Sequence, residues 1–393
     1  MGGGLMQLVA YGAQDIYLTG NPQITFFKVV YRRHTNFSME AIEQTWNGTS
    51  DNANGRCTAT ISRNGDLVHR MYFELTVAAT GTGGGGVNPG SKFITSVELE
   101  IGGQKIDKQT GEWMETWAEL TEPNPTGEVC DMAQLARGGG TLFQSMSGMG
   151  GVDTRTSLAT GELLVVPLQF WFCRNPGLAL PLIALQYHEV KVILEHTMGD
   201  NIGTTQATNK LYCDYIYLDT DERRRFAQVS HEYLIEQVQE QSCTGLRSSA
   251  DLNFNHPVKE LIWHVLPAAL DAASVALAGT WQLKLNGHDR FAARDFRYFT
   301  RTQVWQYHSG AGGLNPVKTD AGGGAGSHID SIGVYSFALK PEEHQPSGTC
   351  NFSRIDNAQL SSGSAGTETA LVYAVNYNVL RIMSGMGGLA YSN

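Results

Sequence analysis

The chain has 393 residues, which is long enough for two domains that each bury a sizeable hydrophobic core. Only 17% of its residues are charged, against about 25% in average globular proteins, and its 45 glycines indicate many tight turns. The formal net charge of −10 argues against a protein whose main task is to coat nucleic acid, because the neutralisation of phosphates needs a cationic surface.

We expect residues 1–22 to form an N-terminal arm. The start MGGGLMQLVAYG has no basic residue and no long apolar run, so it is not a secretory signal. Apolar residues such as Leu5, Leu8 and Ile16 show too little periodicity for independent folding, yet the segment is too hydrophobic for a typical solvated tail. The arm is therefore expected to become ordered against another molecule. The alternative is that it forms a strand of the chain's own fold.

Beyond the arm the dominant pattern is β, because runs of Val, Ile, Phe, Tyr and Thr are separated by Gly, Asn, Asp and Pro clusters. In Val97–Ile101 every second residue is apolar, so one face of that sheet must contact water. Two segments have a helical pattern: Glu112–Leu120, and roughly Asp289–Gln303. The predicted strands are Ile24–Tyr31, Leu67–Val77, Phe93–Ile101, Leu163–Phe172, Val190–Leu194 and Leu211–Leu218.

The two halves of the chain follow one plan, in which five landmarks recur in the same order while the loop lengths differ. This is typical of duplicated domains that diverged in their loops. The matched pairs are Leu99–Gly103 with Leu283–Gly287, Glu112–Leu120 with Asp289–Gln303, Arg137–Gly151 with Gly310–Gly326, Leu163–Phe172 with Ile332–Leu339, and Tyr187–Leu194 with Tyr373–Leu380. The hexamer MSGMGG at 146–151 and 383–388 does not fit this register.

The boundary between the halves is expected near the charged segment Asp219–Glu240. We therefore expect a first domain at residues 23–225, a linker at 226–240 and a second domain at 241–393. Many short strands and few helices in halves of this size fit eight-stranded jelly rolls better than βαβ units. The predicted fold class is all-β, with two tandem jelly rolls and short helices in the loops.

Motifs of catalysis, cofactor binding or metal binding are not found. Neither His188-Glu189 nor His231-Glu232 continues to HExxH, and Ser147 and Ser384 lack the upstream glycine of GxSxG. The chain has no GxxxxGK[ST] motif and no CxxC pair, so its six cysteines are expected to be free thiols in a reducing compartment. We assign no catalytic, cofactor-binding or metal-binding residue, and no cofactor.

Charged clusters have a simple interpretation. Asp219, Asp221 and Glu222 are expected to form a solvated turn rather than a cation site. For Arg223–Arg225 and Arg32–His34 we favour ion pairs with neighbouring subunits or with the adjacent acids over nucleic-acid contact. Three sequons are expected to remain unmodified by the secretory route, since no signal peptide precedes them. The sequons begin at Asn36, Asn47 and Asn351.

Several separated segments carry a specific resemblance to a known family. They are Met6–Asn36 (MQLVAYGAQDIYLTGNPQITFFKVVYRRHTN), Tyr215–Glu236 (YIYLDTDERRRFAQVSHEYLIE), Phe254–Val265 (FNHPVKELIWHV), Ser336–Leu360 (SFALKPEEHQPSGTCNFSRIDNAQL) and the C-terminal VLRIMSGMGGLAYSN. These segments closely resemble the sequences of the major capsid proteins of nucleocytoplasmic large DNA viruses. The matches run from the first ten residues to the last, so the resemblance covers the whole chain.

The resemblance implies a double jelly roll with a structural role and no enzymatic activity. Three copies would form a capsomer of near-hexagonal symmetry that tiles an icosahedral shell. The implied partners are other copies in the homotrimer and in neighbouring capsomers, penton and minor capsid proteins, and the inner viral membrane through the arm at 1–22. Direct genome binding is not expected.

The implied location is the outer capsid shell of the virion, after synthesis and assembly in the host cytoplasm. The alternative is a carbohydrate-binding, lectin-like jelly-roll module, because jelly rolls host many functions.

Overall fold

The structure, a computed structural model, describes residues 3–76, 87–127, 129–131, 140–153, 163–202, 207–244, 249–265, 276–314, 328–363 and 369–391. The chain divides into two units, Met1–Asn36 and Phe37–Asn393. The first unit contains helices α1 (Gly3–Val9) and α2 (Ile16–Thr19), and none of its described residues is buried. Among the described residues, no helix is both long and apolar enough to span a membrane.

The strand predicted at Ile24–Tyr31 is wrong. The described backbone is irregular there, with a turn at Phe26–Phe27, and none of the described sheets includes it. The sequence pattern reports a tendency to pair as a strand, but a strand forms only where a partner supplies the hydrogen bonds of the backbone. Residues 23–36, expected in the first domain, belong to the N-terminal unit.

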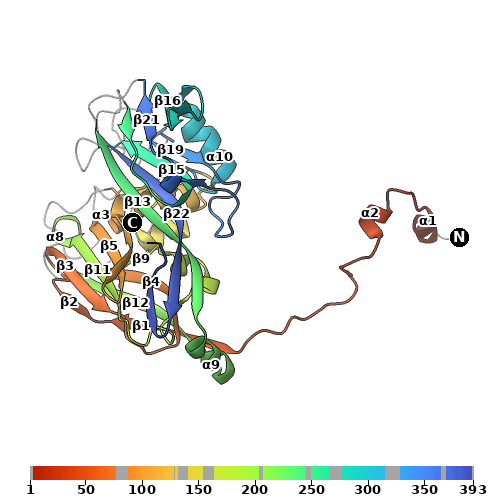
Figure 1. Ribbon diagram of the computed structural model, residues 1–393, viewed down its shortest axis with the longest axis horizontal. Coiled ribbons are helices and arrows are strands. Elements are labelled where there is room, and N and C mark those ends of the chain that lie inside the picture. Colours follow the sequence, from red (N-terminus) through yellow and green to blue (C-terminus); the bar gives the residue numbers. More distant parts are fainter. Residues whose placement is uncertain are drawn as a thin grey trace. The chain divides into compact units, whose positions relative to one another are not determined.

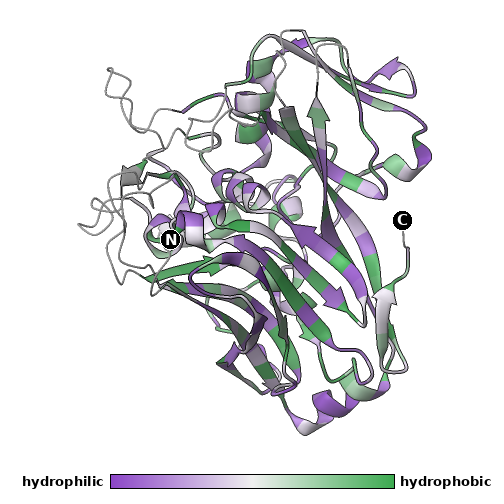
Figure 2. Ribbon diagram, turned by 90° about the vertical axis from the view of Figure 1, so that its left-hand side faces the viewer, coloured by the Kyte–Doolittle hydropathy of each residue, from purple (hydrophilic) through white to green (hydrophobic). Residues whose placement is uncertain are grey.

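The first jelly roll consists of two antiparallel sheets. In one sheet β12 lies between β1 and β4, and β4 also pairs with β9 and β10; in the other the order is β2-β3-β11-β5-β6. Met71, Phe73 and Leu75 of β4 are buried at alternate positions, and Figure 2 shows this alternation of hydropathy along the strands. The strands are β1 (Phe37–Gln44), β2 (Trp46–Gly48), β3 (Asn54–Thr60), β4 (Leu67–Thr76), β5 (Ile94–Ile101), β6 (Gln104–Gln109), β9 (Leu163–Pro167), β10 (Leu180–Pro181), β11 (Val190–Thr197) and β12 (Thr208–Leu218).

The second jelly roll repeats this strand order. One sheet has the order β13-β22-β15-β19 and the other β14-β21-β16-β17, so each strand has a counterpart in β1-β12-β4-β9 or β3-β11-β5-β6. Figure 1 shows the two sets of strands in the second unit. The predicted double jelly roll is confirmed. The strands are β13 (His231–Thr244), β14 (Ala250–Asp251), β15 (Pro257–Val265), β16 (Thr280–Leu285), β17 (His288–Asp289), β18 (Arg294–Asp295), β19 (Ile332–Ser336), β20 (Cys350–Asn351), β21 (Ala358–Ser362), β22 (Thr369–Met383) and β23 (Met386–Leu389).

The first landmark of the internal repeat is the same hairpin in both halves. Gly102 and Gly103, with φ of 58° and 84°, join β5 to β6, and Asn286 and Gly287, with φ of 51° and 76°, join β16 to β17. Positive φ at both central residues is the type I′ turn, which Gly and Asn favour.

The last landmark, in contrast, is wrong. Tyr187–Leu194 leads into β11, whose counterpart in strand order is β21, whereas Tyr373–Leu380 lies in β22, the counterpart of β12. Both segments are apolar and begin with Tyr, and such a pattern does not specify the place of a strand in its sheet.

The repeated hexamer MSGMGG forms two unrelated structures. At 146–151 it ends helix α6 (Leu142–Ser147), with Gly148 at a φ of 65° as the C-cap. At 383–388 it forms the turn between β22 and β23, with Ser384 and Gly385 at φ of 53° and 81°. The preceding helix or strand therefore decides the conformation of the hexamer.

Two helices were predicted, and the structure confirms one fully. Helix α4 (Gly111–Thr121) begins at Thr110, whose hydroxyl accepts from the backbone N–H of Trp113. In Asp289–Gln303 only the end is helical, because the turn at Asn286–Gly287 starts a hairpin. The other helices are the π-helical η2 (Tyr298–Thr302), α10 (Gln303–Tyr307), α3 (Pro89–Lys92), α7 (Trp171–Arg174), α8 (Met198–Asn201), α9 (Thr220–Gln228), η1 (Pro176–Leu178) and η3 (Phe352–Arg354).

The connection between the jelly rolls is short. Helix α9 follows β12, and β13 begins at His231. The segment 226–240, expected as a linker, contains the end of α9 and most of β13, because His231–Thr244 pairs with β22 along its whole length. A small parallel pair, β7 (Cys130–Asp131) and β8 (Val152–Asp153), completes the described strands.

Candidate functional site

The two jelly rolls meet at helix α4. The ring of Trp113 lies 5.4 Å from the ring of Trp117 and 5.1 Å from that of Tyr373 in β22. One hydrophobic core continues from the first jelly roll into β15, β19 and β22 of the second. The backbone N–H of Gly310 donates to the carbonyl of Leu120 at 2.7 Å, so the second half also satisfies the C-terminal end of α4. The junction is therefore packed like a protein interior.

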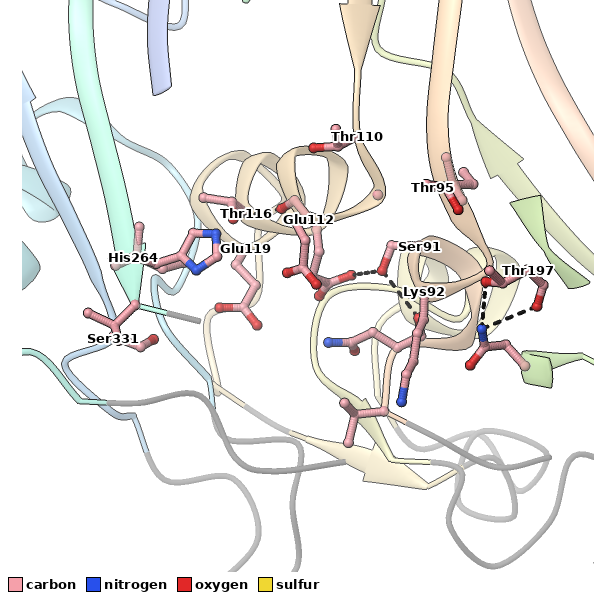
Figure 3. A pocket seen from close by; sticks show the side chains of 18 of the residues that line it. Ser91, Lys92, Thr95, Thr110, Glu112, Thr116, Glu119, Thr197, His264 and Ser331 are labelled. Carbon is pink, nitrogen blue, oxygen red and sulfur yellow. Dashed lines mark hydrogen bonds between the residues drawn. The ribbon is translucent and has the colours of Figure 1, made fainter. Parts of the chain in front are cut away.

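A pocket of about 500 Å³ opens beside α4 (Figure 3). Glu112, Glu115 and Glu119 are spaced i, i+3 and i+7, so they share one face of the helix and line the pocket. His264 of β15 and Ser331 line it from the second jelly roll.

The carboxylates of α4 hold the surrounding loops. Glu115 accepts from the backbone N–H of Gly150 at 2.9 Å and from the hydroxyl of Ser91 at 3.0 Å. Glu119 accepts from the backbone N–H of Leu314 at 3.0 Å.

Burial decides the charge of this pocket. It raises the pKa of Glu115 to about 7, and with the neighbouring Glu115 it raises the pKa of Glu119 well above its usual range. It also lowers the pKa of His264 to about 4. Burial therefore favours the neutral forms of Glu115, Glu119 and His264 over their charged forms. Among the described residues no group of three or more His, Cys, Asp or Glu side chains is arranged to hold a metal ion.

A second buried cluster consists of paired charges. Glu236 of β13 accepts from Lys259 of β15 at 2.7 Å and from Arg174 of α7 at 2.8 Å, and His344 Nδ1 lies 3.3 Å away. Burial alone would raise the pKa of Glu236, but Arg174, His344 and Lys259 outweigh it and lower the pKa to about 2. Since Arg174 lies in the first jelly roll and Glu236 in the second, this cluster joins the two.

A third cluster surrounds His308. Its ring nitrogens lie 3.0 Å from Glu260 Oε2 and 3.1 Å from Glu342 Oε1. Burial by itself lowers the pKa of His308, but the two carboxylates outweigh it and raise the pKa to about 9. The next residue, Ser309, donates from its hydroxyl to the carbonyl of Thr121 at the end of α4. This cluster also ties the second jelly roll to the junction helix.

The residues that sequence motifs singled out have structural roles and do not come together as a site. His188 Nδ1 lies 2.9 Å from the carbonyl of Gly387, and His231 Nε2 lies 2.9 Å from that of Phe226. The carboxylate of Asp219 accepts from the N–H of Thr220 at the start of α9.

Other predicted features are placed as follows. Arg223 pairs with Asp66 at 2.9 Å, an acid distant in the sequence rather than one of the adjacent acids. Of the sequon residues, Asn36 directly precedes β1, Asn47 lies in β2 and Asn351 lies in β20. Five cysteines are free thiols, while the side chain of Cys130 lies outside the described residues.

Sequence reasoning missed the charged clusters of the junction. One signal was visible, since Lys259 and Glu260 interrupt an otherwise apolar strand, PVKELIWHV. A second was the helical spacing of Glu112, Glu115 and Glu119, which lie beside the tryptophans that indicated the helix. Neither pattern predicts which residues these charged side chains contact, because the contacting residues are distant in the sequence.

Comparisons with known proteins agree with this architecture. Residues 25–219 match the family described as "Major capsid protein N-terminus", and residues 222–388 match "Large eukaryotic DNA virus major capsid protein". The chain is 54% identical to the major capsid protein of Pyramimonas orientalis virus over the whole of both chains. It belongs to the family of major capsid proteins of large eukaryotic DNA viruses.

Solved structures support the fold of this capsid protein. A structure described as a quasi-atomic model of the PBCV-1 virus capsid is 36% identical, with a TM-score of 0.76 over 94% of this chain and 100% of the other. The Faustovirus major capsid protein shares the fold, with a TM-score of 0.65 at 13% identity over 95% of this chain and 94% of the other. The lectin-like alternative finds no support in these comparisons. As a major capsid protein, the chain is a component of the virion.

Proposed function

We propose that three copies of this capsid protein form a capsomer of near-hexagonal symmetry, and that such capsomers tile an icosahedral shell. The observation that carries this proposal is the repeated strand order of the two jelly rolls. A threefold axis through three copies arranges six similar blocks around it, because each copy contributes two. The continuous core at α4 supports the proposal, since it makes the two blocks of one copy a single building unit.

The proposed partners are other copies in the trimer and in neighbouring capsomers, penton proteins and minor capsid proteins. The arm at residues 1–22 would contact minor proteins or the inner viral membrane, and its exposed Leu8, Tyr17 and Leu18 support such a contact. The net charge of −10 supports the absence of direct genome binding. We place the protein in the outer shell of the virion, after synthesis and assembly in the host cytoplasm. We also propose that it has no catalytic activity and binds no cofactor or metal.

We also propose a domain division that differs from the sequence-based one. The arm would be residues 1–36, the first jelly roll 37–219, the connection 220–230 and the second jelly roll 231–391. The unit boundary at Asn36 and the pairing of β13 with β22 support these limits.

The test is the assembly state of the purified chain. We expect light scattering to give three times the chain mass of 42.8 kDa, and electron microscopy to show particles of hexagonal outline. A monomer at all concentrations, or a small oligomer that binds glycans on an array, would contradict the proposal.

A further inference from the structure

The segment Ile24–Tyr31 presents a dense apolar surface. Its large apolar side chains are between 70% and 96% exposed; they are Ile24, Phe26, Phe27, Val29, Val30 and Tyr31. Soluble proteins rarely leave so many neighbouring apolar side chains in water unless the surface binds something. The segment therefore needs a partner that covers it.

The backbone of this segment narrows the chemistry of that partner. Its sequence has strong β propensity, with apolar side chains on both faces of a would-be strand, as in a strand that is covered on both sides. In hydrocarbon, an isolated strand would leave its N–H and C=O groups without hydrogen bonds, which is costly. A protein with an open sheet edge supplies these hydrogen bonds and apolar contacts at once. The segment therefore fits a sheet edge better than a lipid surface.

Charge and stoichiometry point to a second copy of this chain. Between residues 21 and 36 the basic side chains are Lys28, Arg32 and Arg33 and no acid is present, whereas the whole chain has a net charge of −10. The segment is thus complementary to the acidic remainder of another copy. In a symmetric assembly of one chain, each segment also finds one receiving copy.

Strand β1 offers a suitable edge. Within the described residues β1 pairs with β12 alone, so no described strand occupies its other edge. Met39 on β1 is 48% exposed, and Phe37 is 53% exposed. Glu40 and Glu43 on the same strand are exposed; Glu40 accepts from the hydroxyl of Tyr217 and Glu43 pairs with Lys210 at 3.3 Å, and each keeps a second carboxylate oxygen for the basic residues of an incoming segment.

We propose that Ile24–Tyr31 of one copy is an exchange strand that adds to the open edge of β1 in a second copy. This inference rests on the proposed self-assembly. It names Ile24–Tyr31 as the segment that passes from one copy to the next. Residues 32–36 join the segment to β1 and span at most about 20 Å when extended. Exchange therefore brings the β1 strands of neighbouring copies close together.

Site-directed crosslinking tests the exchange. A chain that carries Val29→Cys is assembled together with a differently tagged chain that carries Met39→Cys, and the mixture is oxidised. We expect a disulfide between the two tagged chains. A chain with both substitutions that crosslinks only within itself would overturn the proposal, because the segment would then cover its own β1.

A matched pair of variants tests the contribution of the segment. Phe27→Asp should weaken self-association at least about tenfold in sedimentation equilibrium, because it places a charge where an aromatic side chain is buried. Phe27 is 96% exposed in the single chain, so its fold should not change. Thr35→Asp adds the same charge at an exposed position outside the segment and should weaken self-association far less than Phe27→Asp, because it removes no apolar contact.

The remaining outcomes separate the two proposals. If the wild-type chain does not self-associate, the proposed function fails as well. If it forms trimers that Phe27→Asp leaves intact, only the exchange strand fails. The last experiment tests co-flotation of the chain with vesicles of phosphatidylserine and phosphatidylcholine. If Phe27→Asp abolishes co-flotation while self-association persists, the segment binds a lipid surface and the proposal is overturned.

Discussion

Identical side chains at the junction have opposite pKa shifts, and their neighbours explain why. Glu115 is half-buried beside another carboxyl group, and the loss of solvent raises its pKa to about 7. Glu236 is buried, but Arg174, His344 and Lys259 contact it and its pKa falls to about 2. Burial alone thus favours the neutral acid, and only a paired cation reverses that preference.

The pocket carboxyl groups should make stability fall as the pH rises. A carboxyl group whose pKa is raised by folding binds its proton more tightly in the folded chain. Its stabilising effect is complete below the unfolded pKa of about 4 and is lost as the pH rises through the folded pKa, about 7 for Glu115. We expect Glu119→Gln, which keeps the acceptor for Leu314, to reduce this loss in calorimetric scans between about pH 5 and pH 8.

The exposed Glu343, which pairs with Lys340 at 2.7 Å, supplies the control. Glu343→Gln removes only this exposed ion pair and should change the melting temperature little. If the melting temperatures of wild type and Glu119→Gln depend on pH in the same way, folding does not raise the pKa of Glu119.

At the scale of elements, the sequence predicted those whose signal is local. The alternation in β5 and the tryptophan spacing of α4 each depend on neighbours along the chain, and both are found in the structure. Ile24–Tyr31 has an equally strong strand pattern but no partner strand, and pairing is not a local property. Tyr373–Leu380 failed for a related reason, because its place in the sheet depends on distant strands.

Strands β15 and β19 meet at a position that only glycine fits. Gly333 is directly opposite Trp263, and a Cβ atom at Gly333 would lie 2.5 Å from the indole ring. Gly333→Ala should therefore lower the free energy of unfolding by about 1–3 kcal/mol, because the indole must move within a packed core. Urea denaturation measures this effect.

Gly12→Ala is the control for this substitution, since a Cβ there would meet only the Asp15 carboxylate at 3.7 Å. It should leave the unfolding midpoint unchanged. A Gly333→Ala variant as stable as wild type would show that Trp263 has room to shift.

At the scale of the whole molecule, the charged clusters join the jelly rolls. The sequence predicted the number of jelly rolls. It did not predict that Arg174 would meet Glu236, because the two are brought together by the docking of complete domains. Contacts of this kind follow from the tertiary structure and leave no spacing in the sequence.

Lys259→Met should destabilise the junction strongly. The substitution leaves Glu236 buried without its Lys259 partner, with only Arg174 and His344 beside it, and breaking a buried ion pair typically costs about 3–5 kcal/mol. We expect a loss of this size in the free energy of unfolding from urea denaturation. Lys340→Met removes an exposed ion pair and should cost less than about 1 kcal/mol. Equal losses for the two variants would show that the buried pair contributes no more than a surface pair.

The continuous core at α4 has a consequence for the geometry of a shell. Trp113 packs on Tyr373 across the junction, and side chains of both jelly rolls share one hydrophobic cluster. A hinge at this place would have to separate buried rings, so the angle between the two blocks of one copy is fixed by packing. Curvature of the shell must then arise at the contacts between separate copies. A flat facet and a bent edge would use the same rigid subunit and would differ only in the contacts between subunits.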